Sequence, residues 1–185
     1  KKDMRVLSKK EQQQLECILM QDTDPTKFTV LLCLYTGIRI GEACALRWEH
    51  LRLDSGILEV RETIQRIQAP QNIATKTKVI ITEPKSVCSK RDIPLPQFLI
   101  QYAVQFQTDR KAFVLTGEKD QFIEPRTLQN RFRDYVEASG IEHANYHALR
   151  HTFATRCVEL GFEIKSLSEI LGHSNVNITL NRYVH

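Results

Sequence analysis

The chain has 185 residues, of which 42% are hydrophobic and 26% are charged, a composition typical of a soluble globular protein. No apolar run approaches the roughly 18 residues that a membrane span needs, and residues 1–14 lack the apolar stretch of a signal peptide, so we expect a cytoplasmic protein. Five scattered cysteines without a CxxC pair argue against a zinc site or a disulfide framework. The net charge of +4 favours a polyanionic partner without proving one.

The first part of the sequence predicts helices with clear end signals. Ser8 to Glu11 forms a capping box ahead of an apolar helical face. Asp24 followed by Pro25 begins a second helix, which is apolar throughout and ends at Gly37. Such a pattern indicates a central core helix. Residues 42–48 are predicted as a short third helix.

Short β-branched runs then replace the helical pattern. They lie at 57–60, 63–67, 79–81 and 91–95, separated by polar or proline-containing stretches. We therefore predict a small antiparallel sheet or a set of hairpins over about residues 55–95. This insert carries four lysines, namely Lys76, Lys78, Lys85 and Lys90.

The rest of the chain is helical again. We predict helices at about 96–109, 125–139, 147–160, 163–171 and 175–183, with Pro125 at a helix start and Gly140, Gly161 and Gly172 at helix ends. The expected fold class is mainly α with a small antiparallel β-sheet or hairpin insert, in one domain over residues 1–185.

Four polar residues have ordinary explanations when each is taken alone. Arg39 follows a helix end, where arginine is usually solvated, and Glu42 could be its local ion-pair partner. His173 stands beside a helix cap, and Tyr183 near the end of a short helix could simply pack. None of these residues would indicate a catalytic site by itself.

A fifth feature is a cluster at the start of the helix predicted from residue 147. His147, Arg150 and His151 share one face of this helix. Two histidines four residues apart can bind a metal, but Ala148 stands where the zinc motif HExxH has its glutamate. A solvated polar face and a donor cluster for an anion are the two remaining interpretations.

Taken together, these residues supply the parts for metal-free attack on a phosphodiester. Guanidinium groups can clamp the nonbridging phosphoryl oxygens in bidentate fashion. A tyrosine can form a covalent intermediate, and a lysine or histidine can protonate the leaving alkoxide. Spacing alone does not establish that the groups converge.

Four motifs resemble those of the tyrosine site-specific recombinases and phage-type integrases, in family order from residue 36 to residue 185. The motifs are Thr36–Glu42 with Leu46-Arg47-Trp48; Pro84-Lys85-Ser86 with Ser89 and residues 91–95; His147–Thr155; and Leu171–Ser174 followed by Thr179, Tyr183 and His185. Within this family, the motifs look most like those of the integrases of bacterial conjugative transposons and related phages. One small departure is Ile178, where the family has the first threonine of a pair.

The resemblance implies the catalytic domain fold of tyrosine recombinases and a metal-independent cleavage and rejoining of DNA strands. Tyr183 would attack the DNA and become joined to a 3′-phosphate. Arg39 and Arg150 would clamp that phosphate, and Lys85 would protonate the leaving 5′-oxygen. Because the phosphotyrosine conserves the bond energy, no ATP or other cofactor is implied.

Further residues would assist this reaction. His147 would help proton transfer around Tyr183, His173 would hydrogen-bond the phosphate, and Glu42 would support the site from behind. Candidate contacts to the DNA backbone are Lys76, Lys78, Lys90, Arg126, Arg131 and Arg133.

The implied partner is a double-stranded DNA recombination site in the bacterial cytoplasm. Because family members clamp DNA between domains, we expect residues 1–185 to be the C-terminal catalytic domain, with the N-terminal core-binding and arm-binding domains absent from this chain. A homotetramer on DNA is expected of the full-length protein and stays open for this chain. The alternatives are a catalytically silent DNA-binding relative, which the intact residue set argues against, and a type IB topoisomerase, which the short length and the LGH motif argue against.

Overall fold

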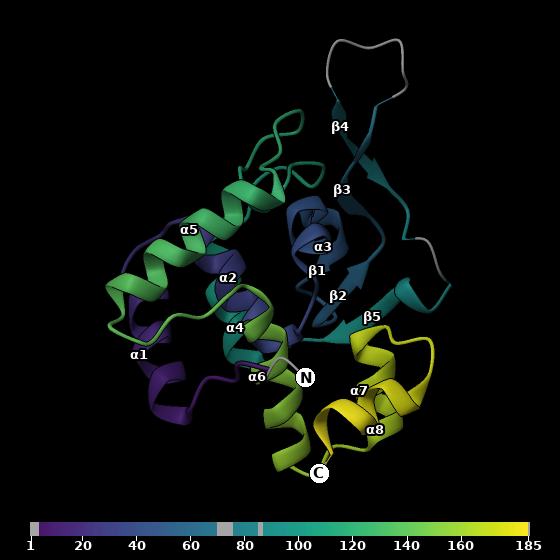
Figure 1. The fold of residues 1–185 in the computed structure, drawn as a ribbon. Helices are drawn as coiled ribbons and strands as arrows, with labels where there is room; N and C mark the ends of the chain where they lie inside the picture. Colours follow the sequence, from purple (N-terminus) through teal and green to yellow (C-terminus); the bar gives the residue numbers. More distant parts are fainter. Residues whose placement is uncertain (1–3, 70–75, 85–86, 185) are drawn as a thin grey trace.

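A computed structural model of the protein describes residues 4–69, 76–84 and 87–184. The chain forms a mainly helical body with two small antiparallel sheets on one side (Figure 1), so the predicted fold class is confirmed. Among the described residues, no helix combines the length and apolar character that crossing a membrane requires.

The first helices begin and end where their local signals predict. Helix α1, Lys9–Leu19, starts with a complete capping box between Ser8 and Glu11. Helix α2, Pro25–Thr36, is capped by the Asp24 side chain and ends at Gly37, whose φ of 65° is left-handed. Most of α2 is buried, as expected of a core helix.

The third helix differs from its prediction. Helix α3 covers Ile40–Ala45, and Trp48–His50 forms a separate 3₁₀ helix, η1. The expected helix over 42–48 is broken because Leu46 and Arg47 are extended. The backbone here forms hydrogen bonds with a distant segment instead of continuing the helix. Val114 N donates to Leu46 O, and Trp48 N donates to Ala112 O.

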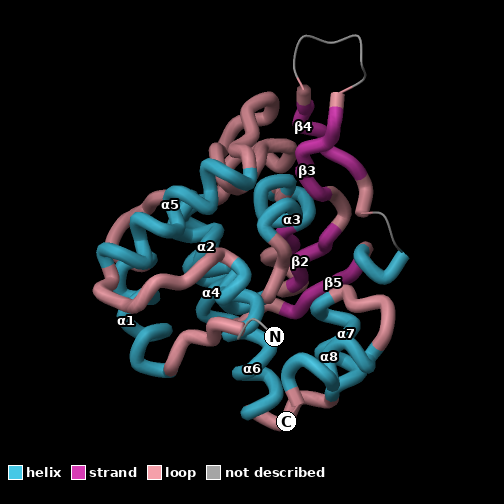
Figure 2. The backbone as a smooth tube through the Cα atoms, viewed as in Figure 1, coloured by secondary structure: helices cyan, strands magenta, loops and turns pink. Residues whose placement is uncertain are grey.

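The β insert forms two separate sheets. Strands β1 (Leu51–Arg52), β2 (Ile57–Val60) and β5 (Arg91–Pro94) pair in the order β1-β2-β5, and η2 (Val87–Ser89) precedes β5. Strands β3 (Thr63–Gln68) and β4 (Thr77–Thr82) form a hairpin that projects from the body (Figure 2). The antiparallel pairing is confirmed, and β3 and β4 are slightly longer than predicted. Pairing of Val60 with Arg91 places the start of β5 beside the end of β2.

The remaining helices are α4 (Gln97–Ala103) with 3₁₀ helix η3 (Val104–Phe106), α5 (Pro125–Ala138), α6 (His147–Glu159), α7 (Ile164–Leu171) and α8 (Val176–Tyr183). The helix predicted over 96–109 is shorter because the chain tightens at η3, where Phe106 stacks on Phe28 with ring centroids 4.7 Å apart. Gly140, Gly161 and Gly172 have positive φ, as predicted for helix ends.

Two apolar clusters hold in place the helices that carry the polar motifs. The main core includes α2 and the first turn of α6. A smaller cluster joins α6, α7 and α8, and consists of Ala154, Cys157, Leu167, Leu171 and Tyr183. The α7–α8 pair therefore packs against α6, and the end of α7 lies close to Gly37, which ends α2.

Candidate active site

Arg39 stands at the N-terminal end of α3, directly after the turn that ends α2. Its Nη1 donates to Glu42 Oε1 over 3.0 Å, and its Nη2 donates to Gly172 O over 3.2 Å. The side chain is 37% exposed. A guanidinium has five N–H groups, so these two bonds leave donors that can meet a ligand from solvent.

Arg150 lies in the first turn of α6 and is buried. Its Nη1 donates to Gly37 O over 2.6 Å, and its Nη2 donates to Leu171 O over 2.5 Å. These carbonyls lie at the C-terminal ends of α2 and α7, where the helix dipole favours a cation. Burial, with the nearby charge of Arg39, lowers the pKa of Arg150 to about 9, which leaves it charged at pH 7.

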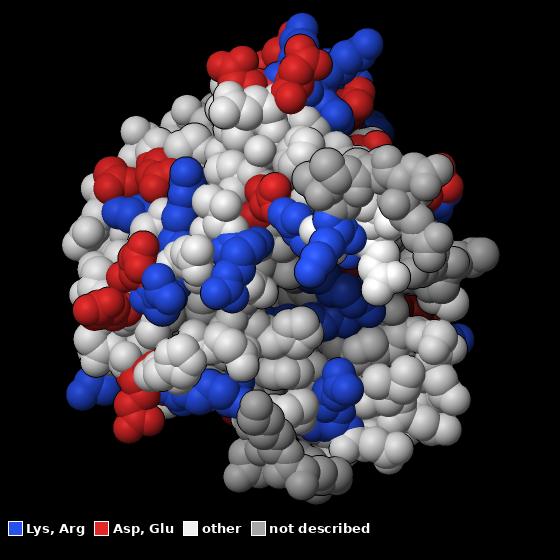
Figure 3. Space-filling view, turned by 45° about the horizontal axis from the view of Figure 1, so that its top comes forward, with Lys and Arg blue, Asp and Glu red and all other residues white. Residues whose placement is uncertain are grey.

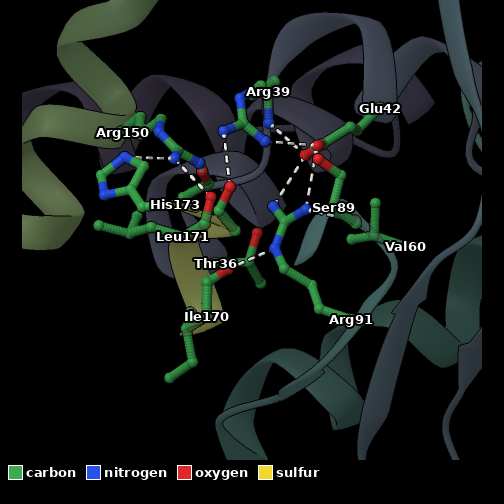
Figure 4. A network of polar contacts seen from close by, with 12 residues as sticks. Thr36, Arg39, Glu42, Val60, Ser89, Arg91, Arg150, Ile170, Leu171 and His173 are labelled. Carbon is green, nitrogen blue, oxygen red and sulfur yellow. Dashed lines mark hydrogen bonds and ion pairs between the residues drawn. The ribbon is translucent and has the colours of Figure 1, made fainter. Parts of the chain in front are cut away.

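Glu42 and Arg91 form a buried ion pair behind the two arginines (Figure 4). The Arg91 guanidinium donates from Nη1 and Nη2 to the two Glu42 carboxylate oxygens, over 3.0 and 2.9 Å. It also bonds to the carbonyls of Ile170 and Ser89, which connects β5 to the end of α7. Burial opposes the charge of Glu42, but Arg91 and Arg39 outweigh it and lower the carboxyl pKa. The pair therefore fixes the Arg39 side chain through its contact with Glu42.

His173 connects the arginine pair to α8. Its Nε2 lies 3.1 Å from Arg150 Nη2, and its Nδ1 lies 2.8 Å from Thr179 Oγ1. Because a guanidinium can only donate, Nε2 is the acceptor and the proton sits on Nδ1. Burial and the charge of Arg150 lower the pKa of His173 to about 4, which keeps the ring neutral at pH 7.

Tyr183 is the last residue of α8 and packs in the smaller apolar cluster. Its hydroxyl lies 2.9 Å from His151 Nδ1. Burial raises the pKa of Tyr183, although Arg150 and Arg182 partly oppose this. His147 is exposed at the start of α6, and its ring centroid lies 5.8 Å from that of His151.

The structure thus brings most of the predicted residues together. Arg39, Glu42, Arg150 and His173 belong to one network around the ends of α2 and α7 (Figure 4). The predicted acid Lys85 lies outside the described residues, so its place in the site stays a prediction.

Two contributors were not singled out from the sequence. Arg91 stands in the predicted lysine motif, but only the fold shows that it pairs with Glu42, 49 residues away. His151 was noticed as a neighbour of His147 and Arg150, but nothing local indicated its contact with Tyr183. For Arg91, the available hint was its place two residues before Ile93 in the predicted strand, which puts the two side chains on the same face.

The six candidate DNA contacts are exposed, but several already have protein partners. Lys90 Nζ lies 2.6 Å from Glu83 Oε2, and Arg131 Nη1 donates to Thr26 Oγ1 over 2.5 Å. Figure 3 shows lysine and arginine gathered across the middle of one face, with most acidic residues toward its edges. This distribution suits a polyanion, while the individual contacts stay predictions.

The site is a pair of preset arginines, a neutral histidine and a buried tyrosine, an arrangement suited to holding a phosphodiester beside a nucleophile. Residues 5–185 match the Phage integrase family, and the chain belongs to it. The predicted family is confirmed.

Relatives in this family include recombinases from bacteria and archaea. The chain is 31% identical over 176 residues to a tyrosine recombinase XerC-like protein of Caldanaerobacter subterraneus, covering 86% of this chain and 45% of that protein. It is 28% identical over 177 residues to tyrosine recombinase XerA of Pyrococcus furiosus, covering 94% and 54%. The chain therefore spans about half the length of these curated relatives.

The fold also agrees with a solved structure. The Tn1549 transposon integrase in complex with a circular intermediate DNA superposes with a TM-score of 0.77 at 22% identity, covering all of this chain and 63% of that one. At this identity the likeness shows the fold, which is that of a tyrosine recombinase catalytic domain.

Proposed function

We propose that this chain is the catalytic domain of a site-specific DNA recombinase that cleaves and rejoins strands through a covalent 3′-phosphotyrosyl intermediate. The observation that carries the proposal is the convergence of Arg39 and Arg150 beside His173. The Tyr183 hydroxyl contacts His151, the residue that follows Arg150 in α6. Family membership and the recombinase relatives support the same activity.

The chemistry follows from the positions of these groups. A DNA phosphate that enters beside Arg39 and Arg150 meets their unused N–H donors, which stabilise the charge that develops on its nonbridging oxygens. The Tyr183 oxygen then bonds to phosphorus while the bond to the 5′-oxygen breaks. Lys85 gives that oxygen a proton, and His147 and His173 assist at the tyrosine and at the phosphate. The 5′-hydroxyl of a partner strand reverses the steps, so no ATP is consumed.

The proposed partner is a double-stranded recombination site. Several similar structures are integrases or recombinases bound to DNA, and the basic face in Figure 3 is suited to a polyanion. On this proposal, residues 1–185 are the C-terminal catalytic domain, and the full-length protein works as a homotetramer on DNA.

A covalent trapping experiment tests the proposal. The protein is incubated with an end-labelled suicide duplex that carries its recombination site and a nick beside the scissile phosphate. The native protein should form a labelled protein–DNA adduct, Tyr183→Phe should form none, and the control Tyr102→Phe, remote from the site, should match the native protein. A native protein that binds the duplex without an adduct is a silent relative. Relaxation of supercoiled plasmid that lacks the site would indicate a topoisomerase instead.

A further inference from the structure

The Tyr183 hydroxyl has a partner that the assigned roles leave out. His151 Nδ1 lies 2.9 Å from the phenolic oxygen, and both side chains are buried, with 9% and 7% of their surface exposed. The two rings lie 5.8 Å apart between centroids. This is a fixed contact in the packed interface between α6 and α8, since Tyr183 also belongs to the apolar cluster there.

A phenol must lose its proton to attack phosphorus, and an ordinary tyrosine pKa near 10 keeps it protonated at pH 7. Burial raises the pKa of Tyr183 further. A proton acceptor in contact with the hydroxyl is therefore required.

The other charged groups that face the hydroxyl cannot fill this role. They are Arg150 on α6, Arg182 on α8 and Arg39 at the start of α3, and a guanidinium has no acceptor atom. Their positive charge helps in a different way, because it stabilises the phenolate once the proton has left.

We propose that His151 Nδ1 is the proton acceptor for Tyr183 in DNA cleavage and returns the proton when the strand is rejoined, an inference that rests on the proposed function. The productive tautomer carries its proton on Nε2, which leaves the Nδ1 lone pair directed at the hydroxyl. His147, expected to assist proton transfer at Tyr183, packs its ring against the ring of His151. It would therefore act through His151 rather than directly on Tyr183.

The proton balance closes in both directions. In cleavage the phenolic proton passes to Nδ1, the tyrosine oxygen bonds to phosphorus, and the leaving 5′-oxygen takes a proton from the acid assigned to Lys85. In rejoining, the 5′-hydroxyl returns its proton to that acid and attacks phosphorus, the phosphotyrosyl bond breaks, and Nδ1–H protonates the departing phenolate of Tyr183.

The surroundings of His151 make this acceptor dependent on the DNA. Burial, the neighbouring His147 and the charges of Arg182 and Arg150 lower the pKa of His151 to about 4 in the absence of a ligand. A phosphate anion between the arginines cancels part of that positive charge and so raises the basicity of His151. The base is strengthened only when a scissile phosphate is present.

The test compares His151→Asn with His147→Asn and with the exposed control His143→Asn in single-turnover cleavage of the suicide duplex. Asparagine keeps a hydrogen-bonding group near the Nδ1 position but is a very weak base. We expect His151→Asn to bind the duplex normally and to cleave about 10²–10⁴-fold more slowly at pH 7. Its residual rate should rise about tenfold per pH unit, since solvent must then take the proton. His143→Asn should match the native protein.

A more acidic nucleophile separates proton transfer from a purely structural role. Trifluorotyrosine placed at position 183 ionises more readily, so it should restore at least tenfold of the rate lost by His151→Asn. A defect that is equal at every pH and is not rescued would overturn the proposal, as would undiminished cleavage by His151→Asn. Rescue of His147→Asn alone would assign the acceptor role to His147.

Two controls keep the outcomes separate. If the native protein forms no adduct, the proposed function fails first, whereas adduct formation with unaffected His151 variants removes only this inference. Circular dichroism checks folding of each variant.

Independently of any His151 variant, ¹⁵N-histidine spectra of the native protein should show an unprotonated Nδ1 at His151 that shifts in Tyr183→Phe. A protonated Nδ1 at neutral pH in the native protein would contradict the proposal.

Discussion

Replacing Arg91 by methionine should destabilise the domain severely, although Arg91 is not proposed to touch DNA. The substitution leaves the Glu42 carboxylate, whose side chain is only 4% exposed, without its two-point partner. Removing one member of a buried ion pair costs about 3–5 kcal/mol. Small domains are stable by about 5–15 kcal/mol, so the loss is a large share of the total.

Unfolding by heat and by urea, both followed by circular dichroism, measures this loss. A chain of this size loses roughly 2–4 °C of melting temperature per kcal/mol, so the Arg91→Met midpoint should fall by about 6–20 °C. The matched control is Arg52→Met, because Arg52 is exposed and, among the described residues, makes only surface ion pairs, with Asp54 at 3.6 Å and with Glu59 at 3.4 Å. Such surface pairs contribute about 0–1 kcal/mol.

The double variant Glu42→Leu with Arg91→Met separates stability from activity. Replacing both members of a buried pair with apolar side chains is often close to neutral, so most of the stability should return. Cleavage should not return, because Arg39 would have lost the carboxylate that orients it. An Arg91→Met variant within about 1 kcal/mol of the native protein, or a double variant no more stable than the single one, would refute this reasoning.

Three further predictions concern pH, salt and the general acid. His151 and His173 have a pKa of about 4 in the folded protein and about 6.5 when unfolded, so the unfolded chain binds more protons between these values. The free energy of unfolding should therefore fall as pH drops from about 6.5 toward 4, and a flat profile in urea titrations would contradict this. DNA binding should weaken steeply with salt, with a log–log slope of about −5 for six phosphate contacts; a flat response in a fluorescence titration would mean that the exposed cations only solvate the surface. Lys85→Ala should cleave ordinary DNA very slowly but recover on a substrate with a bridging sulfur at the 5′ position, because a thiolate leaves without protonation; equal defects on both substrates would reject the general-acid role.

Local signals predicted most of the secondary structure because they act within a few residues. The Ser8 capping box, the Asp24-Pro25 start and the left-handed glycines each satisfy or release backbone groups of their own helix. The helix predicted over 42–48 was wrong where a distant segment competed for the same backbone, as Val114 does at Leu46. Helix propensity is a weak preference that such tertiary bonds override.

The candidate site was predicted by motif and could not have been derived from spacing. Periodicity places Arg150 and His151 on a helix, but it does not say which other element each will meet. The partners lie far apart along the chain: Arg150 and Gly37 are separated by 113 positions, and His151 and Tyr183 by 32. Only the packing of α7 and α8 against α6 brings these pairs into contact.

Two of the glycines with left-handed φ, Gly37 and Gly172, help to explain how the motif residues come together in the fold. Gly37 offers its carbonyl to Arg150, and Gly172 offers its carbonyl to Arg39. A side chain at Gly37 would put a Cβ 2.5 Å from the Phe153 ring, and one at Gly172 would put it 3.1 Å from the Arg91 guanidinium.

Each glycine thus ends a helix and lets the other half of the site approach closely. The carbonyls and Glu42 offset the repulsion between Arg39 and Arg150 before any ligand arrives. Because these bonds leave other guanidinium donors free, the arginines need little reorganisation when a phosphate binds. Such preorganisation is what makes electrostatic stabilisation of a transition state effective.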